Sequence, residues 1–282
     1  MFSLIPLIVA FAGSIYAALW DLKTTEIPDE IPHAMIVFAL LFYGIQSIIE
    51  SNYWIFLNSL IYGGVIFALG FIMYYAGQWG GGDAKILAAI IFLLPVASTT
   101  LPFPLTYLLN VFIVGAGYMI LYSFVLALMN RKIFSAFFVD VKKQKAVLAL
   151  GSIALFATFA IINYSILVLL SYPVNYLSLF RNSLIPLFAA IGLFVIWRFA
   201  KAVEDVGFKK KISLSKLKVG DVLIDSKIWE GITEKQLKKI KKSGKKFVWI
   251  KEGVRFAPTF PLALLFTLLY GDFLFLILRF AV

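Results

Sequence analysis

Apolar residues occupy eight long runs of the chain, and charged residues, prolines or glycines separate each run from the next. Most runs approach or exceed the roughly 20 residues that a helix needs to cross the hydrocarbon core of a bilayer. They are residues 3–20, 31–49, 54–76, 84–101, 105–129, 146–170, 183–200 and 258–280. Pro95 and Pro186 are expected to kink or end the two shorter runs in which they fall. The pattern predicts an α-helical polytopic membrane protein with about eight transmembrane segments, the first a retained helix rather than a cleaved signal peptide.

One long stretch, residues 201–255, is hydrophilic and rich in lysine. Within it, the segments KVGDVLID and KKFVWI have the apolar and β-branched character of strands. The segment TEKQLKKIKKSG predicts a helix, because Thr233 and Gln236 have the spacing of a capping box and Gly244 stands where a C′ glycine belongs. This stretch is therefore expected to form a small α+β module outside the membrane.

These observations divide the chain into four expected parts. Residues 1–130 would form a membrane core, 131–200 further transmembrane helices, 201–255 the basic module and 256–282 a C-terminal transmembrane helix. We expect each boundary to lie within a few residues of these positions, since the ends of elements are the least certain part of a sequence-based assignment.

The distribution of basic residues predicts the orientation of these helices. With the N-terminus outside, every lysine and arginine among the chain's 26 falls on the cytoplasmic side except Arg181 and Arg279. Positive charge is enriched on the cytoplasmic side of membrane proteins, so the N-terminus is predicted outside and the basic module inside. The module is expected to lie beside anionic lipid head groups. Nucleic-acid binding is not expected, because no recognition helix and no interleaving of aromatic and basic residues is present.

Composition limits the chemistry that the protein can perform. The chain is 62% hydrophobic, has no cysteine and has one histidine, His33. These counts exclude disulfides and thiolate catalysis, most zinc sites, and a Ser-His-Asp triad that would need a further histidine. No metal or other cofactor is expected. Any catalysis must therefore depend mainly on carboxylates.

Four aspartates lie within or beside the apolar runs, where a charge is costly. Asp21 ends the first run and Asp83 opens the fourth, and the predicted topology places both at the cytoplasmic face. Two carboxyl groups that meet at a wet edge of a helix bundle can share one proton, so that one acts as acid while the other activates water. Asp272 is expected to mark a structural contact or a helix break at Gly271, and Asp140 is expected to be a solvated loop residue.

Simpler roles are also open for the first two aspartates. Asp83 follows Gly80, Gly81 and Gly82, so it could be the N-cap of the next helix. A carboxylate at a helix C-terminus, such as Asp21, interacts unfavourably with the helix dipole. Its presence there therefore favours a role beyond stabilising the helix. The same dipole argument assigns Asp83 as base and Asp21 as acid. The glycines would let an extended substrate backbone approach the pair.

The segments DLKTTEIPDEI and GGGDAK resemble the paired motifs of the type IV prepilin peptidases, including the archaeal preflagellin peptidases. In that family the first catalytic aspartate stands six residues before an Ile-Pro pair, as Asp21 stands before Ile27. The second aspartate closes a Gly-x-Gly-Asp motif and is often followed by lysine, with one residue between them. The matching residues here are Gly80, Gly82, Asp83 and Lys85.

This resemblance covers about residues 1–130 and, less specifically, the stretch FVWIKEGVRFAPTFPLALLFTLLYGD, which is similar to the C-terminal region of archaeal members. It implies a membrane aspartyl endopeptidase without a cofactor. Its implied substrates are pilin-like or archaellin precursors, which would lose a short basic leader at the cytoplasmic membrane face. Glu26, Asp29 and Glu30 are candidates for attracting that leader. Asp29 departs from the asparagine common in the family. Bacterial members also carry a cysteine-containing domain linked to methylation, and its absence here favours an archaeal enzyme without methyltransferase activity.

Three other interpretations remain open from the sequence. An intramembrane protease of the presenilin type also uses Gly-x-Gly-Asp, but its Pro-Ala-Leu motif is replaced here by Pro261, Leu262 and Ala263. An ion-coupled transporter could use Asp21 and Asp83, although such proteins favour acids near the bilayer midplane and repeated halves. If the protein were a membrane-anchored scaffold, the basic module would be its functional part.

Overall fold

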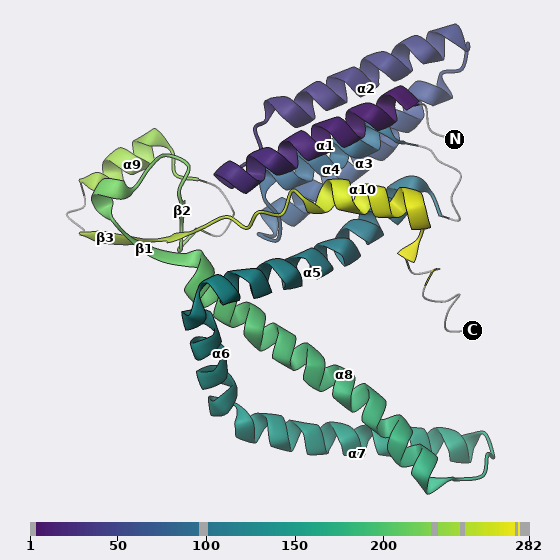
Figure 1. Ribbon diagram of the computed structural model, residues 1–282. Coiled ribbons are helices and arrows are strands. Elements are labelled where there is room, and N and C mark those ends of the chain that lie inside the picture. The colour runs from purple at the N-terminus through teal and green to yellow at the C-terminus, as the bar shows by residue number, and fades with distance from the viewer. Residues whose placement is uncertain (1–3, 96–100, 227–230, 243–245, 274–275, 277–282) are drawn as a thin grey trace. The chain divides into compact units, whose positions relative to one another are not determined.

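A computed structural model describes the chain except residues 1–3, 96–100, 227–230, 243–245, 274–275 and 277–282 (Figure 1). The chain forms two compact units, the first made of Met1–Leu121 together with Lys209–Val282 and the second of Tyr122–Phe208. The long helix α5 (Phe103–Met129) contributes to both units.

Six described helices are long and apolar enough to cross a membrane. They are α1 (Leu4–Thr24), α2 (Glu30–Ile49), α3 (Trp54–Tyr75), α5, α7 (Lys145–Leu169) and α8 (Tyr176–Val203). Two further predicted runs form shorter apolar helices, α4 (Gly81–Leu93) and α10 (Thr259–Tyr270). The predicted helical membrane protein with a small α+β module is therefore confirmed. The described part contains six helices of spanning length, and the number of about eight transmembrane segments stays a prediction.

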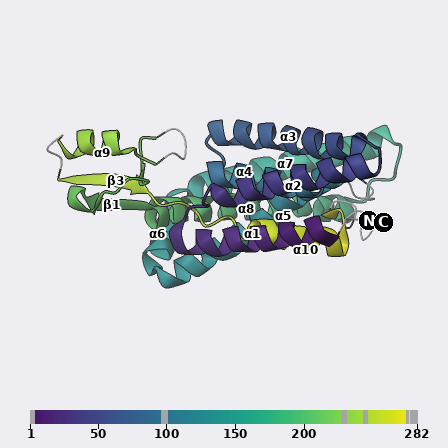
Figure 2. The same ribbon diagram turned by 90° about the horizontal axis from the view of Figure 1, so that it is seen from above.

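Helix α4 is the central element of the first unit, where α1, α2 and α3 pack around it (Figures 1 and 2). Every residue from Ile86 to Leu94 is buried. The hydroxyl groups of Tyr43 and Ser59 donate to carbonyl oxygens in the last turn of α4, each at 2.7 Å. These bonds satisfy carbonyls that a helix end leaves unpaired, so a helix too short to span a bilayer can end inside the bundle.

The hydrophilic module belongs to the first unit and contains a three-stranded antiparallel sheet with the order β1-β3-β2. Its elements are β1 (Lys209–Ser213), a 3-10 turn (Leu214–Lys216), β2 (Val222–Leu223), α9 (Glu234–Lys241) and β3 (Phe247–Lys251). Leu217, Ile232 and Val248 form the buried centre of the module. The predicted strands β2 and β3 and the predicted helix are confirmed. The lysine-rich β1 was not predicted, because its sequence KKKIS lacks an apolar alternation.

The start of α9 has the predicted capping box. The side chain of Thr233 accepts a hydrogen bond from the amide of Gln236, and the side chain of Gln236 accepts one from the amide of Thr233. Gly244, the predicted residue after the helix, lies outside the described residues. The last turns carry Lys238, Lys239 and Lys241, where positive charge complements the helix dipole.

The second unit contains α6 (Arg131–Lys143), α7, α8 and a π-helical turn (Glu204–Phe208) after α8. The stretch between the predicted runs 105–129 and 146–170, where Asp140 was expected in a loop, forms the helix α6 instead. The Asn130 side chain caps α6 by accepting the amide of Lys132, and the apolar face of α6 around Ile133 packs against α8. Asp140 is therefore not a solvated loop residue, because both of its oxygens accept hydrogen bonds from Arg198 of α8.

Two details of α8 differ from the prediction. The helix begins at Tyr176, seven residues before the predicted run, because the side chain of Asn175 accepts the amide of Ser178 and caps the helix there. Of the two roles expected for Pro186, a kink or a helix end, the helix end is wrong, because the residue lies inside α8. In the first unit, α10 ends at Tyr270 and is followed by Gly271 with φ of +71°, which is the helix break expected there.

Candidate active site

Asp21 lies in the last turn of α1, and only 4% of its surface is exposed. The helix ends because Thr25 takes the left-handed conformation, with φ of +64°. From that position its amide donates to the carbonyl oxygen of Asp21 at 2.8 Å, which closes the helix with a backbone bond. The end of α1 thus fixes the direction in which the Asp21 side chain leaves the backbone.

Asp83 lies in the first turn of α4, three residues after Gly80. Gly80 has an extended backbone and precedes the helix, and its amide donates to Oδ2 of Asp83 at 3.3 Å. The carboxylate therefore reaches back to one of the amides that a helix start leaves unpaired, as the third residue of a capping box does. Asp83 is not the N-cap, since α4 begins three residues earlier than the apolar run predicted.

The two motifs touch each other at Gly82. A Cβ atom on Gly82 would lie 2.9 Å from Cβ of Ile27, a distance that real side chains do not adopt. The neighbouring Gly81 has ordinary space, since its nearest atom belongs to Tyr74 at 3.6 Å. Glycine is therefore required at position 82 by the packing of the protein, because the absence of a side chain lets the Ile27 loop pack onto the start of α4.

Asp21 and Asp83 line one cavity of about 830 Å³ within the first unit. Its walls come from the end of α1, the loop after it, the start of α4, the Lys218–Val222 loop of the module, and the segment that follows β3. The two carboxyl groups lie close enough for the charge of Asp21 to act on Asp83. Like charges at short range disfavour joint ionisation, so the pair is suited to hold one proton between two groups.

The other residues singled out from the sequence lie at different places around this cavity. Glu26, Asp29 and Lys85 line it, whereas Glu30 is exposed and is not among its lining residues. The Lys85 ammonium lies 2.7 Å from Oδ1 of Asp29 and joins the starts of α4 and α2. Gly80, Gly81 and Gly82 also form part of the cavity wall.

Sequence reasoning missed the contribution of the segment after β3. The amide of Ala257 donates to Oδ2 of Asp21 at 2.9 Å, and this bond is buried. The partners are 236 positions apart, and the donor is a backbone group, so neither periodicity nor residue type could indicate the contact. The loop from Lys218 to Val222 was likewise expected only as the start of a strand, not as a wall of the site.

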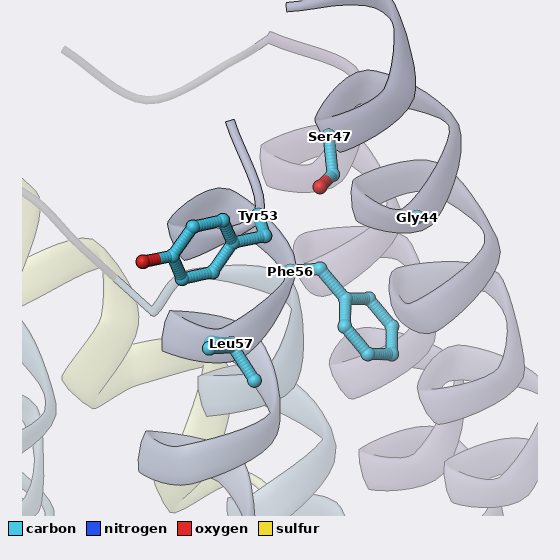
Figure 3. A pocket seen from close by; sticks show the side chains of 5 residues that line it. All are labelled: Gly44, Ser47, Tyr53, Phe56 and Leu57. Atoms are coloured by element: carbon cyan, nitrogen blue, oxygen red, sulfur yellow. The ribbon is translucent and has the colours of Figure 1, made fainter. Parts of the chain in front are cut away.

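A second cavity, of about 450 Å³, lies between the end of α2 and the start of α3 (Figure 3). Its lining residues are Gly44, Ser47, Tyr53, Phe56 and Leu57, so it has no carboxylate and no amine. Among the described residues, no group of three or more histidine, aspartate or glutamate side chains is arranged to hold a metal ion. The cavity with the two aspartates is therefore the better candidate for chemistry.

Comparison with known proteins agrees with the motifs. Residues 8–120 match the Type IV leader peptidase family, and this range includes both Asp21 and Asp83. The resemblance predicted from the two motifs is thus confirmed for this part of the chain.

Three archaeal relatives show the extent of the similarity. A prepilin peptidase, EppA, of Methanothermobacter thermautotrophicus is 29% identical over 144 residues, which are 46% of this chain and 37% of the relative. A preflagellin peptidase of Methanocaldococcus jannaschii is 32% identical over 133 residues, or 47% of this chain and 53% of the relative. One of Methanococcus maripaludis is 33% identical over 137 residues, or 45% and 59%. The matches thus span between about a third and three fifths of these relatives.

Proposed function

We propose that this protein is an aspartyl endopeptidase of the membrane that removes the short basic leader from pilin-like or archaellin precursors. The observation that carries the proposal is the meeting of Asp21 and Asp83 in one cavity, within the region that matches the leader peptidase family. The names of the relatives, prepilin and preflagellin peptidase, support the same class of substrate.

The chemistry follows from two carboxyl groups that share a proton. The ionised carboxylate takes a proton from a water molecule, which attacks the carbonyl carbon of the scissile peptide bond. The protonated carboxyl group donates its proton to the carbonyl oxygen, where negative charge develops. The other carboxyl group then gives the proton it took from water to the leaving amine nitrogen as the C–N bond breaks, and the carbonyl re-forms as the first carboxyl group recovers its proton. The helix dipoles alone favour Asp83 as base and Asp21 as acid. The Ala257 amide and the positive charge of Arg255 favour the ionised form of Asp21 instead, so we treat the two carboxyl groups as one acid–base pair and assign neither role to either residue.

We also propose where the cavity and the module lie relative to the membrane and which acid attracts the leader. The positive charge of the chain favours a cytoplasmic location for the cavity and a position of the module beside anionic head groups. Glu26 lines the cavity and is the best placed of the three acids to attract a basic leader. Asp29 already pairs with Lys85, and Glu30 lies outside the lining. We include no methyltransferase activity and no nucleic-acid partner in the proposal.

The test uses membranes that contain the wild type, Asp21→Asn, Asp83→Asn or the control Asp225→Asn, an exposed aspartate of the module outside the cavity. Each is offered a pilin-like precursor, and leader removal is followed by gel shift and mass spectrometry. We expect cleavage by the wild type and the control and loss of cleavage in the other two, at equal amounts of inserted protein. Cleavage that persists in either active-site variant would refute the two-carboxylate mechanism. A cut inside the hydrophobic segment of the precursor would instead favour an intramembrane protease.

A further inference from the structure

The last turn of α1 is held by a segment from the other end of the chain. We call residues 252–257 the strap, because they join β3 of the module to α10 and pass beside the end of α1. Nε of Arg255 donates to the carbonyl oxygen of Leu22 at 3.0 Å. This bond satisfies a carbonyl that the helix end leaves unpaired, and the guanidinium charge complements the negative end of the helix dipole.

The strap also contacts the Asp21 carboxylate itself. The amide of Ala257 donates to Oδ2 of Asp21, and the positive charge of Arg255 acts on the same carboxyl group. A buried carboxylate has few rotamers that keep a hydrogen bond to a fixed backbone amide, so this contact determines where its oxygen atoms point. The backbone carbonyl of Asp21 is held by Thr25 and its side chain by Ala257.

The strap is itself fixed to the first unit. The hydroxyl group of Tyr118 in α5 donates to the carbonyl oxygen of Arg255 at 2.8 Å. Phe256 packs so closely against Gly115 that a Cβ atom there would lie 2.8 Å from the Phe256 ring. The same ring lies edge-on to Phe260, with the centroids 5.7 Å apart. Because these anchors hold the carbonyl group of Arg255 and the side chain of Phe256, the strap can act as a fixed reference for Asp21.

These contacts give a structural role to Arg255 and Ala257, which lie outside residues 8–120, the range that matches the peptidase family. We propose that Arg255 is a positioning residue, which together with the Ala257 amide holds the Asp21 carboxylate in the orientation needed to cleave the leader. The inference rests on the proposed function, and it makes the module and its strap part of the active site rather than an appended domain. Arg255 acts through Asp21 and the end of α1, so it is expected to affect kcat rather than the binding of the precursor.

The test compares Arg255→Met, Arg255→Lys, Tyr118→Phe and the control Lys238→Met, which removes one exposed charge from α9 of the same module. We expect Arg255→Met to lower kcat at least about tenfold with KM for the precursor unchanged, since misplacement of a reacting group is costly. Arg255→Lys keeps the positive charge at the end of α1 and a charged N–H donor for the single bond to Leu22, so it should recover most of kcat. Tyr118→Phe loosens the strap without altering its charge and should lower kcat severalfold, whereas the control should cleave at the wild-type rate.

Several outcomes would overturn the proposal. Wild-type kcat in Arg255→Met, or a change confined to KM, would mean that Arg255 does not position Asp21. A loss in Arg255→Met that Arg255→Lys does not relieve, combined with wild-type cleavage by Tyr118→Phe, would also contradict it. These results are distinct from failure of the proposed function, in which the wild type itself would not cleave or Asp21→Asn would remain active. Tyr118→Phe removes one hydroxyl group, so it gives a result even if Arg255→Met does not accumulate.

Discussion

The contact between Gly82 and Ile27 gives a sharp test of how the two motifs depend on each other. In Gly82→Ala, the new Cβ atom would lie 2.9 Å from Cβ of Ile27 and 3.4 Å from two further atoms of that side chain. The closest atom is next to the backbone of Ile27, so a rotamer change cannot relieve the clash and the loop after α1 must move. The matched control is Gly81→Ala, whose Cβ atom would have 3.6 Å of space.

The size of the effect follows from two opposing contributions. Alanine gains up to about 1 kcal/mol over glycine within a helix, and this gain applies to both variants. Overpacking costs about 1–3 kcal/mol and applies to Gly82→Ala alone. We therefore expect Gly81→Ala to be as stable as the wild type or slightly more stable. Gly82→Ala should be less stable than Gly81→Ala by about 1–3 kcal/mol.

The effect on activity should be larger than the effect on stability. The loop carrying Ile27 continues directly from the end of α1, so moving it changes the position of Asp21 relative to Asp83. A shift of about 1 Å between reacting groups can cost roughly a hundredfold in rate. The assay measures leader cleavage and thermal unfolding of both variants in the same detergent. Equal cleavage by Gly81→Ala and Gly82→Ala would refute the argument that this contact sets the geometry of the pair.

Two further predictions concern charges at other places in the protein. Arg198 hydrogen bonds to Asp140 and holds the pKa of that carboxyl below its ordinary value of 3.8. The stabilisation of α6 by this pair is therefore fully present above pH 3.8, and it should be lost as the pH falls through the lower pKa that Asp140 has in the folded protein. At neutral pH, Asp140→Asn should make proteolysis of α6 faster than in the wild type. In acid, the two proteins should be cut at the same rate. Glu26→Gln should raise KM for a precursor with a basic leader and leave kcat unchanged, because Glu26 lines the cavity. The exposed Glu30→Gln is its control, and an unchanged KM in Glu26→Gln would remove Glu26 from leader binding.

The sequence predicted the parts of the fold that depend on local patterns. Long apolar runs predicted the spanning helices, and the spacing of Thr233 and Gln236 predicted the cap of α9. It failed where polar residues have distant partners. The lysines of β1 take part in a strand because β3 pairs with them, and Asp140 belongs to a helix whose apolar face packs against α8. Neither partner is visible in the local sequence.

The candidate site likewise has a part that could be predicted from the sequence and a part that could not. Asp21 and Asp83 could be found from the sequence, because an acid at the end of an apolar run is costly and unusual. Their meeting in one cavity depends on the Gly82–Ile27 contact and on the central place of α4, both of which are properties of packing. The role of the strap could not be predicted, since a backbone amide has no signature in the amino-acid sequence.

The bond between Asp21 and Ala257 has a consequence for the order of events during biosynthesis. Its two partners are 236 positions apart, so the ribosome adds Ala257 long after it has added Asp21. Domains fold from the N-terminus as synthesis proceeds, and α1 to α4 can therefore pack long before the strap exists. The Asp21 carboxylate would acquire its final orientation only after the strap has been synthesised. A chain synthesised only as far as α4 would consequently carry both aspartates but lack the contact that orients Asp21.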